Sequence, residues 1–336
     1  MISLPEITAV LKNDDPAFLE QLARRARRLT RMHFGNTISL YAPLYLSNYC
    51  ENFCTYCGFN CGLDIHRSRL TPAGMEKEMA CIARKGIRNL LLLTGESPRH
   101  SPPSYLKEAV ILAGKYFSGI GVEIYPLQTE EYKILHAAGV DSVTVYQETY
   151  DRKRYAHYHP AGRKRDYDYR YQTPQRAAEA GIPRLTLGVL FGLGKPAADL
   201  HALYRHLEDL MKRYPGVEYA LSVPRIIPLP DAPDRYHILS DRNLAKVIAL
   251  TRILFPSVGI NLSTREPAAI RDRMIHLGVT RISAESKTMV GGYYRKTEED
   301  AQFYIKDQRS VGEILRMLKS QGLDPVFTDW RRIGSA

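Results

Sequence analysis

Residues 85–96 read Lys-Gly-Ile-Arg-Asn-Leu-Leu-Leu-Leu-Thr-Gly-Glu, and the fold class can be predicted from the pattern of this stretch. A helix-ending glycine, Gly86, is followed by four consecutive leucines, and the polar residues Thr94, Gly95 and Glu96 come directly after them. A short apolar run without polar alternation is typical of a strand covered on both faces, as in parallel sheets. The stretch therefore predicts a buried parallel strand that delivers polar side chains at its carboxyl end.

The same order of helix, glycine and apolar run recurs along the chain. Helical stretches also end at Gly139, Gly181 and Gly278. Including the run above, eight apolar runs alternate with stretches of helical spacing, at 42–48, 89–94, 122–127, 142–148, 184–193, 219–227, 259–266 and 281–287. This alternation predicts an α/β fold.

Eight strands that alternate with helices over about 250 residues are typical of a (β/α)8 TIM-type barrel. An open doubly wound sheet is the alternative. We favour the barrel because polar residues follow nearly every run, and in a barrel these strand ends form the mouth of the active site. We expect the barrel at residues 38–290, after an N-terminal helical extension at 1–37 and before a C-terminal segment at 291–336 that closes it.

Composition narrows the class of protein. The hydrophobic content of 44% suits a folded chain with a sizeable core. No apolar run is long enough to span a membrane and the N-terminus lacks a signal-peptide pattern, so a cytoplasmic protein without membrane contact is expected. The net charge of +11 favours acidic partners, either an electron-carrier protein or nucleic acid. The densest basic stretch, 23–28, has the spacing of a solvated amphipathic helix, and no RNA-binding or zinc-finger motif is present.

Three of the five cysteines lie close together, in the spacing Cys50-x3-Cys54-x2-Cys57 after the first predicted strand. Clustered thiols in a reducing compartment more often bind metal than pair with one another. Three thiolates can ligate three irons of a [4Fe-4S] cluster and leave the fourth iron open for a substrate or cofactor. Zinc normally takes four ligands, and this spacing does not match common zinc modules. Cys61 and Cys81 are interpreted as structural.

The cysteine spacing, its place in the chain and Tyr56 before the third cysteine resemble the radical S-adenosylmethionine superfamily. Further motifs, from about residue 40 to the C-terminus, resemble the aromatic amino acid lyases of that superfamily, and above all the tyrosine lyases of thiazole biosynthesis. These motifs are 44–48, 94–96, 145–150, 262–266, 282–288 and 329–330. Hydrogenase maturases of the same group carry a second cluster on C-terminal cysteines. Since this chain has no cysteine after Cys81, formation of carbon monoxide and cyanide is not expected.

The resemblance implies a [4Fe-4S] cluster and S-adenosylmethionine as cofactors, which together generate a 5′-deoxyadenosyl radical. It implies a lyase that takes hydrogen from the amine of L-tyrosine and cleaves the Cα–Cβ bond. The products would be p-cresol and 2-iminoacetate (dehydroglycine), the latter used for the thiazole of thiamine.

The resemblance also implies roles for single residues in cofactor binding. Thr94, Gly95 and Glu96 would hold the methionyl amino group of the cofactor, whose ammonium suits a carboxylate; Glu96 at a helix N-terminus is the alternative. Glu148 would lie near the ribose or the amino group, or else pair with an arginine of residues 152–170. Further cofactor contacts would come from Tyr56, Gly192 and Arg225, and Arg225 could also reach the substrate.

Substrate binding is expected at the ends of the last two strands. Arg265 would hold the carboxylate of the amino acid as a bidentate pair, with Ser283 as a second contact. The alternative for Arg265 is an ion pair with the adjacent Glu266.

The expected partners are an aromatic amino acid, an acidic flavodoxin or ferredoxin as electron donor and a thiazole synthase. A lyase that acts on tryptophan or another amino acid is the first alternative. A basic nucleic-acid-binding protein with a structural metal site is the second.

Overall fold

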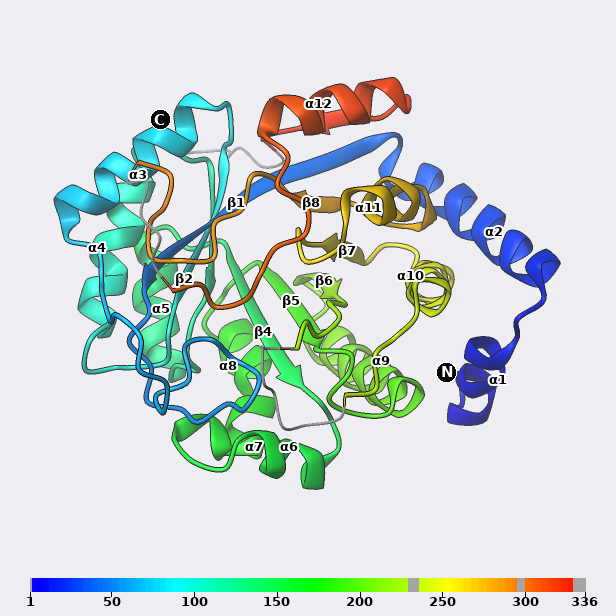
Figure 1. Cartoon of the computed structure of the whole chain (residues 1–336), viewed down its shortest axis with the longest axis horizontal. Coiled ribbons are helices and arrows are strands. Elements are labelled where there is room, and N and C mark those ends of the chain that lie inside the picture. Colours follow the sequence, from blue (N-terminus) through cyan, green and yellow to red (C-terminus); the bar gives the residue numbers. More distant parts are fainter. Residues whose placement is uncertain (1, 229–235, 295–299, 329–336) are drawn as a thin grey trace.

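The computed structural model describes residues 2–228, 236–294 and 300–328 (Figure 1). Dipeptide 329–330, one of the motifs above, lies outside the described residues. Eight parallel strands close into a barrel, because β1 pairs with β2 on one side and with β8 on the other. The barrel is therefore confirmed and the open doubly wound sheet is wrong. Its strands are β1 (Thr37–Ser47), β2 (Asn89–Thr94), β3 (Gly119–Glu123), β4 (Ser142–Glu148), β5 (Arg184–Val189), β6 (Glu218–Ser222), β7 (Gly259–Leu262) and β8 (Arg281–Ser283).

Helices surround the barrel, and several of them end where the sequence predicts. Gly86, Gly139, Gly181 and Gly278 follow helical segments with φ angles of +88°, +127°, +84° and +143°, which glycine adopts without a steric cost. The helices packed around the strands are α3 (Pro72–Arg84), α4 (Pro103–Ala113), α5 (Thr129–Ala138), α6 (Arg152–Tyr158), α7 (Tyr167–Tyr171), α8 (Thr173–Glu179), α9 (Pro196–Arg213), α10 (Asp241–Leu254) and α11 (Ala268–Met274).

The leucine run of β2 has no polar alternation because neither face of the strand is on the outer surface of the protein. Leu90 and Leu92 are buried in the core between barrel and helices, whereas Leu91 and Leu93 line a cavity inside the barrel mouth. Strand residues alternate in this way because successive side chains point to opposite faces. The run therefore supplies both the outer core and the wall of the site.

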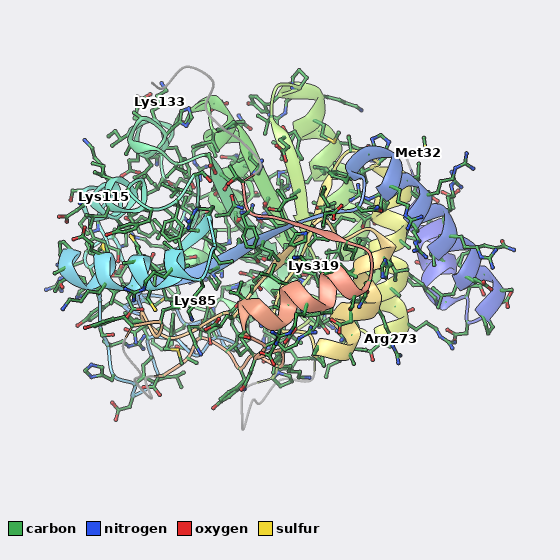
Figure 2. All side chains as sticks on the ribbon, turned by 90° about the horizontal axis from the view of Figure 1, so that it is seen from above. Met32, Lys85, Lys115, Lys133, Arg273 and Lys319 are labelled. Atoms are coloured by element: carbon green, nitrogen blue, oxygen red, sulfur yellow. The ribbon has the colours of Figure 1, made fainter. Side chains whose placement is uncertain are left out.

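Two helices precede the barrel, α1 (Leu4–Lys12) and α2 (Pro16–Phe34). They lie along the flank formed by α9 and α10 (Figure 1). Met32 is 68% exposed on α2, and Figure 2 shows it on the outer side of the molecule.

The chain after β8 crosses the barrel mouth before it reaches α12 (Val311–Ser320) and β9 (Asp324–Val326), which pairs with the start of β1 (Figure 1). Gly58 of the cysteine loop donates a hydrogen bond to the carbonyl of Gln302 (2.9 Å), and Lys306 donates one to the carbonyl of Thr264 (3.0 Å). These bonds hold the segment over the mouth.

Several strands end earlier than the apolar runs that predict them. The run at 122–127 is out of phase with β3, which begins at Gly119 and ends at Glu123. The reason is that Ile124, Tyr125 and Leu127 are also buried, although they lie in the loop beyond the strand. Burial continues past the last ladder hydrogen bond, so an apolar run alone does not mark the strand end.

No helix in the described part of the chain is both long and apolar enough to cross a membrane.

Candidate active site

A cavity lies at the carboxyl ends of the strands. Active sites of (β/α)8 barrels form at this face. Its wall combines strand ends from most of the barrel with the segment that crosses the mouth. The lining residues from β1 to β4 are Tyr41, Pro43, Tyr45, Leu91, Leu93, Glu123, Tyr146 and Glu148, and those after β7 and β8 include Ser263, Thr264, Arg265, Ser283, Gln302 and Phe303.

The cysteine loop follows β1 and bends back over the cavity. Cys57 lines the cavity, Cys54 is buried and Cys50 is half-buried. The loop is held by backbone bonds to its neighbours: Gly95 donates to the carbonyl of Ser47 (2.8 Å), and Thr55 donates to that of Tyr158 (3.2 Å). Three thiols are thus fixed on one short loop at the edge of the cavity.

The chemistry of these thiols fits an iron–sulfur cluster. Burial, together with the nearby charges of Glu96 and Cys57, raises the pKa of Cys50 to about 11. Burial likewise raises the pKa of Cys54 and Cys57, although Lys164 opposes it at both. Buried thiolates of this kind need a positive partner, which the irons of a cluster supply.

Each cysteine of a [4Fe-4S] cluster binds a different iron, so the three sulfurs need not converge on one point. Within residues 2–228, 236–294 and 300–328, no three Cys, His, Asp or Glu side chains are arranged to hold a single metal ion. Three cysteines on one short loop are a donor set that suits such a cluster. Cys61, the nearest further cysteine, is half-buried, and the residues that line the cavity do not include it.

Two carboxylates beside the loop, the buried Glu148 and the half-buried Glu96, contact two cations, the buried Arg170 and the half-buried Lys164. Arg170 donates to Oε1 of Glu96 (2.8 Å) and lies 3.7 Å from Glu148, and Lys164 donates to Glu148 (2.6 Å). The second oxygen of Glu96 accepts from the amide of Asn52 (2.9 Å). Burial opposes the ionisation of Glu96, but Arg170 and Lys164 outweigh it and hold its pKa below the usual value. The alternative that Glu148 pairs with an arginine of residues 152–170 is therefore observed, with Arg170, whereas the shorter contact with Lys164 was not part of that alternative.

Glu148 also has an unusual backbone. Its φ of +68° is in the left-handed region, a backbone conformation that residues other than glycine seldom adopt. The register between β4 and β5 shifts between Tyr146 and Glu148. The conformation directs the Glu148 carboxylate to the cavity wall, a strained arrangement of the kind often found at functional sites.

Arg265 lines the cavity, and it does not form the ion pair with Glu266 that was the alternative prediction. Glu266 is held by Arg225, which also forms an ion pair with Asp241 (2.7 Å), so the Arg265–Glu266 pair is not formed. The guanidinium of Arg265 lies 3.4 Å from the ring centre of Phe303. Ser283 ends the neighbouring strand β8, and its hydroxyl accepts a hydrogen bond from the amide of Thr264 (3.1 Å).

Of the remaining predicted cofactor contacts, Tyr56 lines the cavity, whereas Thr94, Gly192 and Arg225 do not. Tyr56 lines it, and its hydroxyl is 2.8 Å from Nε2 of His159. Thr94 has a buried hydroxyl without a hydrogen-bond partner in the described structure. Gly192 has a φ of +127° and packs against Ile226, while Arg225 lies among its acidic partners outside the lining. Their contacts with the cofactor remain predictions.

Sequence reasoning missed the cation Lys164 and the carboxylate Glu123, and it did not single out Arg170 among the arginines of residues 152–170. Lys164 and Arg170 belong to a stretch rich in Tyr, Arg and His whose role the sequence left open, and nothing in their spacing marks them as buried. Glu123 was hidden inside an apolar run. A single acidic residue between Val122 and Ile124 was the available signal.

Comparisons with known proteins agree with this geometry. The sequence family described as the radical SAM superfamily matches residues 44–207, and the biotin and thiamin synthesis associated domain matches residues 222–324. The 2-iminoacetate synthase of Escherichia coli (strain K12) is 40% identical, over 97% of this chain and 86% of that protein. The 2-iminoacetate synthase of Salmonella typhimurium is 38% identical, over 98% of this chain and 88% of that protein.

Among solved structures, HydG, a maturase of the [FeFe]-hydrogenase, superposes with a TM-score of 0.92 at 35% identity, over 97% of this chain and 73% of that chain. The two curated relatives are named as synthases, so the comparisons show an enzyme. The chain therefore belongs to the 2-iminoacetate synthase family of radical S-adenosylmethionine lyases.

Proposed function

We propose that this chain cleaves the Cα–Cβ bond of L-tyrosine and releases p-cresol and 2-iminoacetate for assembly of the thiamine thiazole. The observation that carries the proposal is the position of Arg265, whose guanidinium faces a tyrosine-walled cavity that also contains Cys57. A guanidinium binds the carboxylate of an amino acid in a bidentate pair. The 40% identity with a 2-iminoacetate synthase supports the same reaction.

When bound, the [4Fe-4S] cluster and S-adenosylmethionine supply the radical that starts the reaction. Cys50, Cys54 and Cys57 would ligate three irons of the cluster. Glu96 and Glu148 would bind the polar groups of the cofactor, in exchange for part of their present contact with Arg170 and Lys164.

The other residues of the cavity would position the substrate and exclude water. Arg265 and Ser283 would fix the carboxylate, and a fixed carboxylate restricts where the amine can lie. The hydroxyl of Tyr45 donates a hydrogen bond to Oε1 of Gln302 (2.6 Å), which ties the barrel wall to the segment over the mouth. This bond would help to keep the closed cavity dry.

Anaerobic product analysis tests the proposal. Reconstituted protein with S-adenosylmethionine and dithionite is expected to release p-cresol from L-tyrosine. Indole products from L-tryptophan without p-cresol from L-tyrosine would instead support the tryptophan lyase alternative. Cys57→Ser should lose cluster absorbance and p-cresol together, and Cys61→Ser is the matched control that should keep both.

The partners remain part of the proposal. The reduced cluster needs an electron donor, and the net charge of +11 favours an acidic flavodoxin or ferredoxin. A thiazole synthase would take up the 2-iminoacetate. Both the thiolate ligands and the reduced cluster suit a reducing compartment, so we place the reaction in the cytoplasm.

A further inference from the structure

Glu123 is a carboxylate in the cavity that none of the roles above uses. It ends β3 and lines the cavity, while its neighbours Ile120 and Val122 are buried in the outer core. Glu96 and Glu148 each bond to a cation, but among the described residues the Glu123 carboxylate has neither a hydrogen-bond nor an ion-pair partner. A carboxylate held in a cavity without a protein partner is free to bind a ligand.

The barrel places Glu123 opposite Arg265. Three strands separate β3 from β7 in one direction, β4, β5 and β6, and three in the other, β8, β1 and β2. Arg265 follows β7 closely, and both residues line the same cavity. A substrate whose carboxylate binds Arg265 therefore extends its side chain toward the β3 wall.

The wall between these two residues suits an aromatic ring. Tyr41 and Tyr45 of β1, Tyr146 of β4, and Leu91 and Leu93 of β2 line it. Tyr45 pairs in register with Leu93, and Leu93 pairs with Glu123, so these three residues stand at one level across adjacent strands. A ring at this level would have Glu123 at its edge.

We propose that Glu123 accepts a hydrogen bond from the phenol hydroxyl of tyrosine and thereby sets the preference for a para-hydroxyphenyl side chain. The inference rests on the proposed function, because it takes tyrosine as the substrate. An O–H···O⁻ bond is among the stronger hydrogen bonds in proteins. A site built to bond a substrate hydroxyl rejects the analogue that lacks it, since its own polar group is then left unpaired.

The protonation of Glu123 gives the contact a pH dependence. Burial raises its pKa to about 7, the charge of Glu148 adds to this, and Arg265 opposes it. The titratable and charged groups that interact with it are Glu148, Arg265, Lys164, Arg170, Tyr41, Tyr45 and Tyr146. The ionised carboxylate is the better acceptor, so tyrosine should bind more tightly as the pH rises through 7. Phenylalanine has no hydroxyl to pair with the carboxylate, so its binding should not tighten over this pH range.

Calorimetric binding to the anaerobically reconstituted holoenzyme with S-adenosylmethionine, but without reductant, tests the proposal. The probes are L-tyrosine and L-phenylalanine, and the variants are Glu123→Gln and Glu123→Ala. Both variants should weaken tyrosine binding by about 10- to 100-fold and leave phenylalanine within about threefold of the wild type, the size expected for a lost charged hydrogen bond. Glu218→Gln, at the opposite end of the barrel, is the matched control and should bind both amino acids as the wild type does.

Two results would overturn the proposal. One is an equal loss of tyrosine and phenylalanine binding in the Glu123 variants, which would place the carboxylate at the ammonium that both amino acids share. The other is unchanged binding of both. Failure of the proposed reaction is a separate result, because it would show as tyrosine binding to the wild type without release of p-cresol.

Discussion

In the proposed function, Arg265 is the residue that would anchor the substrate. The pairing of Glu266 with Arg225 leaves its guanidinium to the cavity, where the ring of Phe303 supports it by a cation–π contact. The fork of a guanidinium matches a carboxylate in a way that a lysine ammonium does not.

Replacement of Arg265 by lysine tests this anchor. We expect Arg265→Lys to raise the KM for tyrosine by roughly tenfold or more, because one bidentate contact becomes a single point charge. Steady-state release of p-cresol measures the effect. Arg273→Lys, on the outer side of α11 (Figure 2), is the control, and an unchanged KM in Arg265→Lys would remove this residue from the carboxylate site.

Arg170 is buried and joins two carboxylates beside the cysteine loop, so its loss should also affect stability. Arg170→Met would leave Glu96 and Glu148 with Lys164 as their remaining cation, and breaking a buried pair costs about 3–5 kcal/mol. Urea unfolding of the cluster-free protein measures the change. Arg152→Met, which breaks an ion pair with Asp168 on the surface, should leave the unfolding midpoint unchanged, and equal effects of the two variants would contradict the buried role of Arg170.

At the scale of elements, the end of β2 and the cysteine loop are built against each other. A Cβ at Gly95 would stand 2.8 Å from the carbonyl carbon of Tyr49, with the carbonyl oxygen nearer still. Backbone atoms cannot move aside as a flexible side chain can. Glycine at position 95 therefore permits the strand end to touch the loop that holds the cysteines.

Gly95→Ala should displace this loop. We expect reconstituted Gly95→Ala to bind less iron than the wild type and to have a lower melting temperature. Gly114→Ala is the matched control, since its Cβ would approach the carbonyl oxygen of Ile111 at an ordinary 3.4 Å, in a helical backbone with φ of −58°. Wild-type iron content in Gly95→Ala would show that the contact is dispensable.

For the whole molecule, two basic surfaces lie at different distances from the cysteine loop. Helix α2 carries exposed arginines such as Arg25 and Arg28, but it packs on α10, at the flank of the barrel (Figure 1). The exposed Arg163 and Arg165 belong to a short helical turn that follows Gly162, and a Cβ at Gly162 would lie 2.7 Å from the Cα of Asn52 in the cysteine loop. An acidic electron donor would have to dock near the cluster, so the second surface suits it.

Charge reversal separates the two surfaces. Arg163→Glu with Arg165→Glu should slow flavodoxin-driven cleavage of S-adenosylmethionine at low salt by about tenfold, within the range that electrostatic steering produces. Dithionite-driven cleavage should be unchanged, because a small reductant needs no docking surface. The control is Arg25→Glu with Arg28→Glu, and a larger effect of that pair would move the docking site to α2.

The features that could be predicted from the sequence are those that depend on residues close together in the chain. The cysteine motif needs only residues 50–57, and the barrel needs only the local alternation of helix, glycine and apolar run. Thr94, Gly95 and Glu96 could be placed at a strand end because they directly follow an apolar run. Such signals lie within one element, where periodicity and turn chemistry act.

Contacts between side chains that are far apart in the sequence are seen only in the folded structure. The pairing of Glu266 with Arg225 left Arg265 to the cavity, and Arg170 came to join Glu96 with Glu148. Glu123 reached the cavity because β3 ends there, a boundary that the buried loop beyond the strand conceals in the sequence. These contacts depend on strand register and on closure of the barrel, and both are set by the packing of the whole chain.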